Sequence, residues 1–431
     1  MAAVEAIALA LLDTRDAGEI PACAGTGVDD TGEQIAQLAR HLTHDGVFAP
    51  RVCAPQASPL LKAARAFGVP VLELPATPAS GVARWRTLWR LRRAFAGGKP
   101  LLLHSFDPHG LALGRLLAAT RRANLTARVH TALWLRECAT LTRLGKEWQG
   151  LARIACGSSL VCARLLELGL PRECMDIILP AADMAAMPPR ANRKDGRFVF
   201  MVLEPLTDDS GLEQLLEAVR ILTRLEAESP AAVPASVAPV PGAPPSLVDA
   251  TPPLPRWEVR IVGQGPAFAR LLTSAKVLGV DRFLSFLGAQ DPCNVAPQAD
   301  VILATALRPQ GSWPAPVYAW GMGIPLLYNA VPGHRELARG RECGLMLPME
   351  EPAVLAMHML RCLQDTALCR HLAAMSATVR PHTGFARLQH EYAQLYTRAA
   401  AAQSWVIPQP EEVEPRALRG GGHTTPEQVR P

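Results

Sequence analysis

The chain has 431 residues, of which 49% are hydrophobic and 19% are charged, and its formal net charge at pH 7 is +5. This composition excludes a globally disordered protein, and the length is sufficient for two domains with cores of their own. The mild positive charge is compatible with an anionic substrate or an anionic membrane surface, and it requires neither.

Ten cysteines are scattered along the chain, without a C-x-x-C pair and without the His/Cys spacing of a zinc site. We interpret them as small core residues of a protein in a reducing compartment, and we expect it to be cytoplasmic. The apolar segment 1–12 has no basic leader and ends at Asp13, so it predicts a first core strand rather than a signal peptide. We expect no membrane span, because no window of about 20 residues is apolar throughout.

In the first 190 residues, short apolar runs alternate with segments of helical periodicity, which predicts a parallel α/β domain. The expected strands are 6–12, 49–54, 69–74, 100–105, 127–132, 154–158 and 175–180. The expected helices are 34–42, 60–67, 81–96 and 159–168.

The predicted helix 81–96 is basic and carries two tryptophans. Trp85 and Trp89 lie near one face, and arginines surround the rest: Arg84, Arg86, Arg90, Arg92 and Arg93. A basic amphipathic helix of this kind can lie on an anionic membrane. The same pattern also suits a core helix with a solvated basic face, and both interpretations stay open.

Two histidines stand where predicted strands end. His104 closes one strand and His130 another. Because parallel strands present their carboxyl ends at one edge of the sheet, both histidines are candidates to hydrogen-bond a ligand bound at that edge.

The remaining segments define the predicted domain organisation. Residues 1–190 are predicted to form the first Rossmann-like domain, and residues 195–380 the second. Residues 230–255 are rich in proline and alanine and predict a disordered insertion in a surface loop. Residues 381–402 predict a last helix, and residues 403–431 a disordered tail.

The stretch 299–347 carries most of the functional signal. A buried strand over 300–304 is followed by a loop, then by a helix from Pro314 to Met322 that ends at Gly323, a candidate left-handed cap. A second strand follows, then a turn at 332–333 and a short helix from 335. This doubly wound order places the loops 307–312 and 330–334 on one crevice, where backbone N–H groups and helix N-termini favour an anion.

The motifs AWGMGIP at 319–325 and PGHRE at 332–336 resemble the donor-sugar site of family 4 glycosyltransferases, the retaining GT-B enzymes. The resemblance covers roughly residues 6–400. It implies an α/β protein of two doubly wound Rossmann-like domains that face a cleft, with a C-terminal helix crossing back to the first domain.

The resemblance also implies a set of substrate-binding residues. They are the turn residues Gly32 and Glu33, the strand-end His104, the Val-Gly-x-Gly residues Gly263 and Gly265, and, in the central stretch, Gly311, Tyr318, Gly333 and Glu336. His130, Arg308 and Gln310 are the candidate catalytic residues.

Four positions depart from the family pattern. Pro205 and Ser210 stand where the family has an arginine and a lysine that bind the donor diphosphate. Gln310 and Tyr318 stand where it has two glutamates. Because a fixed positive charge stabilises the departing diphosphate, these replacements put the chemistry in question.

Three hypotheses follow. In the first, the protein is a retaining transferase that moves a sugar from a nucleotide-sugar donor to a glycan or lipid-linked acceptor in bacterial cell-envelope assembly, with Arg308 supplying the positive charge. In the second, it is an inactive GT-B protein that binds a glycan or a partner enzyme. In the third, it uses a polyprenyl-phosphate sugar or a phosphosugar as donor. We expect no metal, no other cofactor and no nucleic-acid partner, and any membrane contact would be peripheral, at the inner face.

Overall fold

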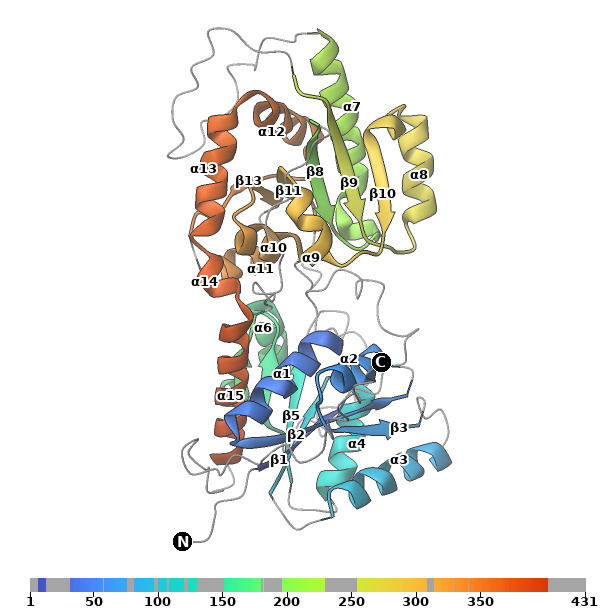
Figure 1. Cartoon of the computed structure of the whole chain (residues 1–431), viewed down its shortest axis with the longest axis vertical. Helices are drawn as coiled ribbons and strands as arrows, with labels where there is room; N and C mark the ends of the chain where they lie inside the picture. Colours follow the sequence, from blue (N-terminus) through green and yellow to red (C-terminus); the bar gives the residue numbers. More distant parts are fainter. Residues whose placement is uncertain are drawn as a thin grey trace, which may run out of the picture.

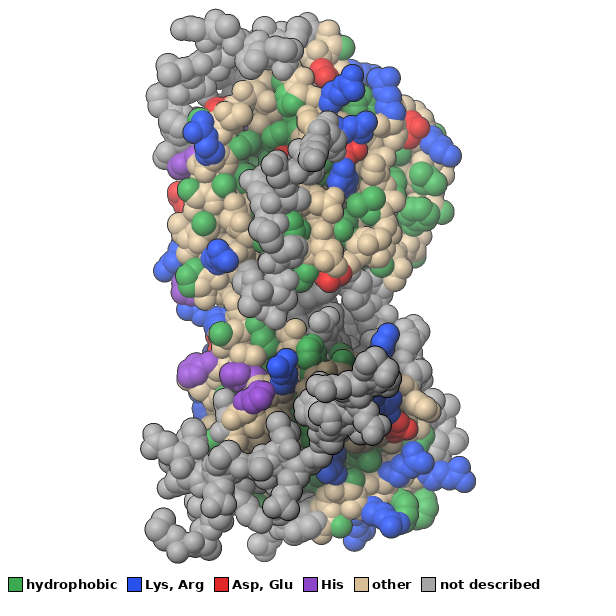
Figure 2. Space-filling model, viewed as in Figure 1, with side chains coloured by type: hydrophobic (Ala, Val, Ile, Leu, Met, Phe, Trp, Pro, Cys, Tyr) green, Lys and Arg blue, Asp and Glu red, His purple; other side chains and the backbone are tan. Residues whose placement is uncertain are grey.

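The computed structural model describes residues 7–12, 32–56, 58–75, 81–96, 100–106, 108–119, 123–129, 151–179, 181, 196–228, 254–307, 314–329, 331–339 and 341–401. These residues form two parallel sheets stacked along the long axis of the molecule (Figure 1). The space-filling outline narrows between the two halves (Figure 2).

The first sheet has seven strands in the order β3-β2-β1-β4-β5-β6-β7. The strands are β1 (Ile7–Leu12), β2 (Phe48–Pro55), β3 (Val71–Leu74), β4 (Leu101–Ser105), β5 (Ala123–Val129), β6 (Leu151–Cys156) and β7 (Met175–Ile177). Its helices are α1 (Gly32–Asp45), α2 (Pro59–Ala66), α3 (Gly81–Ala94), α4 (Pro108–Ala119), α6 (Ser159–Glu167) and the 3-10 turn η3 (Arg172–Cys174).

The second sheet has six strands in the order β10-β9-β8-β11-β12-β13. The strands are β8 (Phe198–Leu203), β9 (Trp257–Val262), β10 (Leu284–Gly288), β11 (Val301–Ala304), β12 (Leu326–Asn329) and β13 (Leu345–Leu347). Its helices are α7 (Leu212–Glu228), α8 (Phe268–Val277), α9 (Pro292–Val295), α10 (Pro314–Met322), α11 (Pro332–Leu337), α12 (Pro352–Gln364), α13 (Thr366–Ala377) and α14 (Arg380–Thr383), with 3-10 turns η4 (Asp208–Ser210), η5 (Asp281–Phe283) and η6 (Ala296–Gln298).

Alternating side chains of the central strands fill separate cores on the two faces of each sheet. In β1, Ile7, Leu9 and Leu11 pack on the side of α1, α2 and the C-terminal helix α15 (Phe385–Ala401), whereas Ala10 and Leu12 pack on the other side. β8 divides in the same way between the two cores of the second sheet. Because both faces of a parallel sheet are covered, these strands appear in the sequence as continuous apolar runs, and the doubly wound prediction is confirmed.

The crossing helix α15 returns to the first sheet, as predicted. It runs alongside the first half of the molecule (Figure 1), where Tyr392 and Tyr396 are buried against β4. Arg398 bonds to Asp176 of β7 at 2.8 Å, and Arg387 donates to the carbonyl oxygen of Leu179 at 2.8 Å. These contacts fix the helix to the half of the molecule opposite the one it leaves.

Two predicted helix starts are wrong. α1 begins at Gly32 rather than at residue 34, and α11 begins at Pro332 rather than at residue 335. The predicted turn at 332–333 is therefore the first turn of α11, where a proline without an N–H costs no helical hydrogen bond. Gly323 does end α10 with a φ of +63°, as expected for a left-handed cap. The predicted insertion at 230–255 falls mostly outside the described residues, and the predicted tail wholly so.

The described helices include none that is long and apolar enough to cross a bilayer. The eight described cysteines are all free thiols: Cys53, Cys156, Cys162, Cys174, Cys293, Cys343, Cys362 and Cys369.

Candidate functional site

The carboxyl ends of the two sheets face each other. α6 follows the last residue of β6, and α11 follows the end of β12. The backbone N–H of Ser159, the first residue of α6, donates to Oε2 of Glu336 on α11 at 2.7 Å. This bond joins the two halves directly, so the strand ends of both sheets border one interdomain region, as the doubly wound pattern requires of a ligand crevice.

Within the second sheet the strand order reverses between β8 and β11, and glycines allow the loops at this point to pack closely. A Cβ atom on Gly211 would lie 2.0 Å from the carbonyl oxygen of Thr305, and one on Gly263 would lie 2.0 Å from that of Glu204. A Cβ atom on Gly265 would lie 2.4 Å from the carbonyl oxygen of Leu206. The predicted binding glycines Gly263 and Gly265 thus have a structural requirement of their own, because any side chain there would collide with the backbone.

The loop after β8 is fixed to the end of β11. Thr305 Oγ1 donates to the carbonyl oxygen of Ser210 at 2.7 Å, and the N–H of Leu307 donates to that of Asp209 at 2.9 Å. Pro205 and Ser210, the two positions without the familiar charges, are both buried. The chain therefore leaves β11 at a fixed point of the crevice, one residue before Arg308.

An arginine of α8 lies beside this loop in the described part of the chain, and it is already paired. Arg270 of α8 lies 2.8 Å from Asp208 and 3.1 Å from Glu213. Its charge is therefore balanced by two carboxylates, and it is a poor substitute for a free cation at the crevice.

Glu204, directly after β8, is a buried carboxyl that the sequence analysis missed. Only 2% of the residue is exposed. Burial raises the pKa of Glu204 to about 8, although a hydrogen bond from the Ala306 amide opposes that rise. The available signal was an acidic residue immediately after the apolar run 198–203. The group holds its proton at neutral pH and sits at the point of strand reversal.

A buried polar chain continues from this point along the strand ends. Asn329 Nδ2 donates to the carbonyl oxygen of Ala306 at 3.0 Å, and Nδ1 of His334 lies 3.0 Å from the carbonyl oxygen of Asn329. Burial lowers the pKa of His334 to about 4, so its ring is neutral at physiological pH. Nδ1 must then carry the proton, because its partner is a carbonyl that can only accept.

The other predicted residues fall in different surroundings. The ring of His104 is fully buried and meets Phe106, Tyr392 and Tyr396 edge-on. Tyr318 is 2% exposed, and its hydroxyl lies 3.6 Å from Cys293 Sγ. Both side chains pack in cores, so in this structure neither presents a polar atom at the crevice surface.

Three further predicted binding residues lie at the amino ends of helices. Gly32 and Glu33 lie in the first turn of α1, and Gly333 in that of α11. Glu336 bonds to Ser159 across the two halves. The remaining predicted residues, His130, Arg308, Gln310 and Gly311, lie outside the described residues, so their roles stay predictions.

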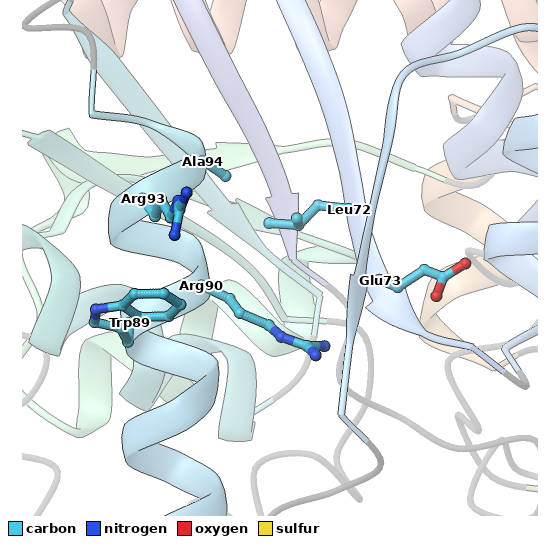
Figure 3. A pocket seen from close by; sticks show the side chains of 6 residues that line it. All are labelled: Leu72, Glu73, Trp89, Arg90, Arg93 and Ala94. Carbon is cyan, nitrogen blue, oxygen red and sulfur yellow. The ribbon is translucent and has the colours of Figure 1, made fainter.

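A second surface feature lies on the first half, away from the crevice. A pocket between α3 and the edge strand β3 is lined by Leu72, Glu73, Trp89, Arg90, Arg93 and Ala94 (Figure 3). Leu72 and Arg90 point into the space between helix and strand, whereas Glu73 points away (Figure 3) and pairs with Arg65. The pocket wall on α3 is therefore basic and aromatic.

Two family profiles match the chain. The one described as "Glycosyl transferase 4-like domain" matches residues 31–172, and the one described as "Glycosyl transferases group 1" matches residues 243–365. No curated protein sequence matches it.

Solved structures match nearly the whole chain. HepE of Anabaena, in complex with UDP and glucose, is 15% identical with a TM-score of 0.68, covering 91% of this chain and 99% of its own. Sucrose-phosphate synthase of Thermosynechococcus elongatus is 16% identical with a TM-score of 0.65, covering 92% and 100%. A glycosyltransferase of Rickettsia africae is 13% identical with a TM-score of 0.67, covering 92% and 98%. At these identities the likeness shows the fold.

Proposed function

Because this chain belongs to the group 1 glycosyltransferases of the GT-B fold, with family 4 fitting its two domains, we propose that it transfers a sugar from a nucleotide-sugar donor to a glycan or lipid-linked acceptor with retention. The observation that carries the proposal is the contact between Ser159 and Glu336, which brings the strand ends of both sheets to one region. A donor held by one half then lies opposite an acceptor held by the other, and this arrangement supplies proximity and orientation. HepE, one structural relative, binds UDP-glucose.

Arg308 is the residue proposed to stabilise the departing diphosphate. It follows Leu307, which is bonded to Asp209 beside the point of strand reversal. A fixed positive charge at a developing anion is the main electrostatic contribution that a transferase of this kind makes. Gln310, the other candidate on this loop, is proposed to hydrogen-bond the sugar, and His130 to face it from the first half.

A second candidate function, an inactive GT-B subunit that binds a glycan or a partner enzyme, is favoured by one observation. The donor loop 204–211 contains no arginine or lysine, its Pro205 and Ser210 are buried, and Arg270 of the adjacent α8 is paired with two acids. Losing one charge-assisted contact typically costs about 1.5–3 kcal/mol, so losing several weakens a nucleotide donor severely.

Peripheral membrane contact through α3 forms part of the proposal for a lipid-linked acceptor. Trp85 and Trp89 are 66% and 49% exposed, and the arginines between and after them are exposed as well. The helix 81–94 contains no acidic residue. Vesicles with and without anionic lipid test it: binding should require the anionic lipid and fall when Arg86, Arg90 and Arg93 are replaced by glutamine, and equal binding by both proteins would contradict the contact.

The function is tested by thermal shift and by sugar release with a panel of UDP-, GDP- and ADP-sugars. We expect one donor class to raise the melting temperature and to be hydrolysed or transferred, and Arg308→Ala to abolish turnover while the fold persists. The matched control is Arg224→Ala, which removes an exposed arginine of α7. Donor stabilisation without turnover, unchanged by Arg308→Ala, would support the binding subunit instead.

A further inference from the structure

Glu204 lies at the point where the second sheet reverses its strand order. It follows β8 immediately, and β11 is the neighbour of β8 across the reversal of strand order. Ligands of open α/β sheets bind outside the carboxyl ends of the strands at such a reversal. The residue is also held in place by its backbone, because its N–H donates to the carbonyl oxygen of Val262 at 3.2 Å.

Its carboxyl group is only partly satisfied. The backbone amide of Ala306 donates to the carboxyl, and Oε2 is buried without a hydrogen-bond partner among the described residues. Buried polar atoms in native proteins nearly always have a partner, and an exception asks for an explanation such as a ligand. Within the part of the chain that the structure describes, one oxygen of Glu204 is therefore left for a further partner, and a bound ligand is such a partner.

The surroundings favour the protonated form of this carboxyl. The described groups against Glu204 are uncharged: the Ala306 amide at its carboxyl, and Val262 and Gly263 at its backbone. Asp208 and Asp209 of η4 follow on the same loop, and Asp208 is paired with Arg270. Desolvation is the main cause of the raised pKa, and no charged neighbour contributes to it. A protonated carboxyl has one O–H to donate, whereas a carboxylate could only accept and would repel an anion.

We propose that Glu204 is a ligand-binding residue of the donor crevice, whose neutral carboxyl donates a hydrogen bond from Oε2 to a phosphate oxygen of a nucleoside diphosphate. This inference rests on the proposed function, and it names the residue of the second sheet that contacts the donor phosphate. It also makes binding of the nucleoside diphosphate dependent on pH. Ionisation of Glu204 removes the O–H that donates the hydrogen bond and leaves a negative charge beside the phosphate. Conversely, a bound phosphate raises the pKa of Glu204 further, because its negative charge disfavours the carboxylate.

The experiment is a calorimetric titration of the protein with UDP at pH 6.5, 7.5, 8.5 and 9.0, for the wild type, Glu204→Gln and Glu204→Ala. We expect wild-type affinity to fall by up to tenfold per pH unit above the pKa of the residue. Glu204→Gln keeps an N–H donor and cannot ionise, so its affinity should be nearly constant over this range. Glu204→Ala should bind about tenfold more weakly than wild type at pH 6.5, because it lacks the donor.

Asp281→Asn is the matched control, since Asp281 is an exposed acid of η5, at the amino end of β10. It should follow the wild-type pH profile, and Glu204→Gln corrects for any titration of UDP itself. Identical profiles for wild type and Glu204→Gln, with UDP bound by both, would overturn the role of Glu204 and leave the proposed function standing. Failure of the wild type to bind UDP at pH 6.5, and also GDP and ADP when each is titrated in the same way, would overturn both the inference and the nucleotide-sugar donor.

Discussion

His104 and Glu204 both lie where a sheet reverses its strand order, one in each half of the molecule, His104 on the strand after the reversal and Glu204 at the end of the strand before it. His104 lies near the end of β4 and pairs in register with Leu11 of β1, where the first sheet reverses its strand order. Glu204 lies at the reversal between β8 and β11. Three aromatic rings enclose His104, whereas one oxygen of Glu204 lacks a partner among the described residues. Topology therefore defines where polar residues gather, and the packing above each position decides whether they bind or fill space.

Removing the ring that covers His104 should have the largest effect. Tyr396 of α15 is fully buried against His104 and Phe48. We expect Tyr396→Ala to lower the free energy of unfolding by about 4 kcal/mol, through lost burial and a residual cavity. Urea denaturation measures it, with Phe268→Ala as control because Phe268 is a 44% exposed ring on α8. A loss below about 1 kcal/mol would mean that α15 does not cover the first sheet in solution.

Replacing Glu204 should have the next largest effect, and its sign depends on pH. Burial raises the pKa of Glu204 from 4.5 to about 8, so between these values the folded protein keeps a proton that the unfolded chain has released. Ionisation therefore favours unfolding increasingly as the pH rises from 4.5 to 8. Glu204→Gln, which does not titrate, should be more stable than wild type by roughly 3.5 kcal/mol at pH 8, relative to their difference at pH 5.

Urea denaturation of both proteins at pH 5, 6.5 and 8 checks this prediction. Asp281→Asn, at an exposed position, should run parallel to wild type at all three pH values because it retains Glu204. Parallel stability curves for wild type and Glu204→Gln would show that Glu204 is hydrated in solution, and the contrast with His104 would then disappear.

The smallest expected change in stability concerns the contact between Ser159 and Glu336, which joins the two halves of the molecule. Glu336→Ala removes the acceptor of the Ser159 N–H, and we expect it to lower the free energy of unfolding by about 1–2 kcal/mol, because the bond involves a charged acceptor at a partly exposed position. Small-angle scattering should show a larger radius of gyration for the variant, and Glu350→Ala, an exposed acid elsewhere on the second half, is the control. An unchanged radius would mean that other contacts hold the halves together.

The fold could be predicted to a large extent because it depends on patterns within single segments. The run 300–304 is apolar throughout and was recognised as a buried strand, and Gly323 followed by Pro325 marked the end of α10. Helix starts were less accurate at α1 and α11. There Gly32 and Pro332 suggest a turn by local propensity, while the structure continues the helix through them.

The surroundings of the site residues were much harder to predict, because they depend on contacts between distant segments. His104 was expected at the crevice edge, but helix α15, almost 300 residues later in the sequence, covers it. Glu204 was overlooked because a single acid after a strand has no distinctive spacing. Its significance arises from Ala306, which lies about 100 residues away in sequence and bonds to its carboxyl in the folded chain.

The return of α15 has a mechanical consequence. The chain passes from the first half to the second between Ala181 and Gly196, and back again at Gly384, between α14 and α15. Two covalent crossings resist separation and sliding of the halves, and they leave rotation about the line that joins them as the easiest relative movement. Such a rotation would separate α6 from α11, so the bond between Ser159 and Glu336 resists it.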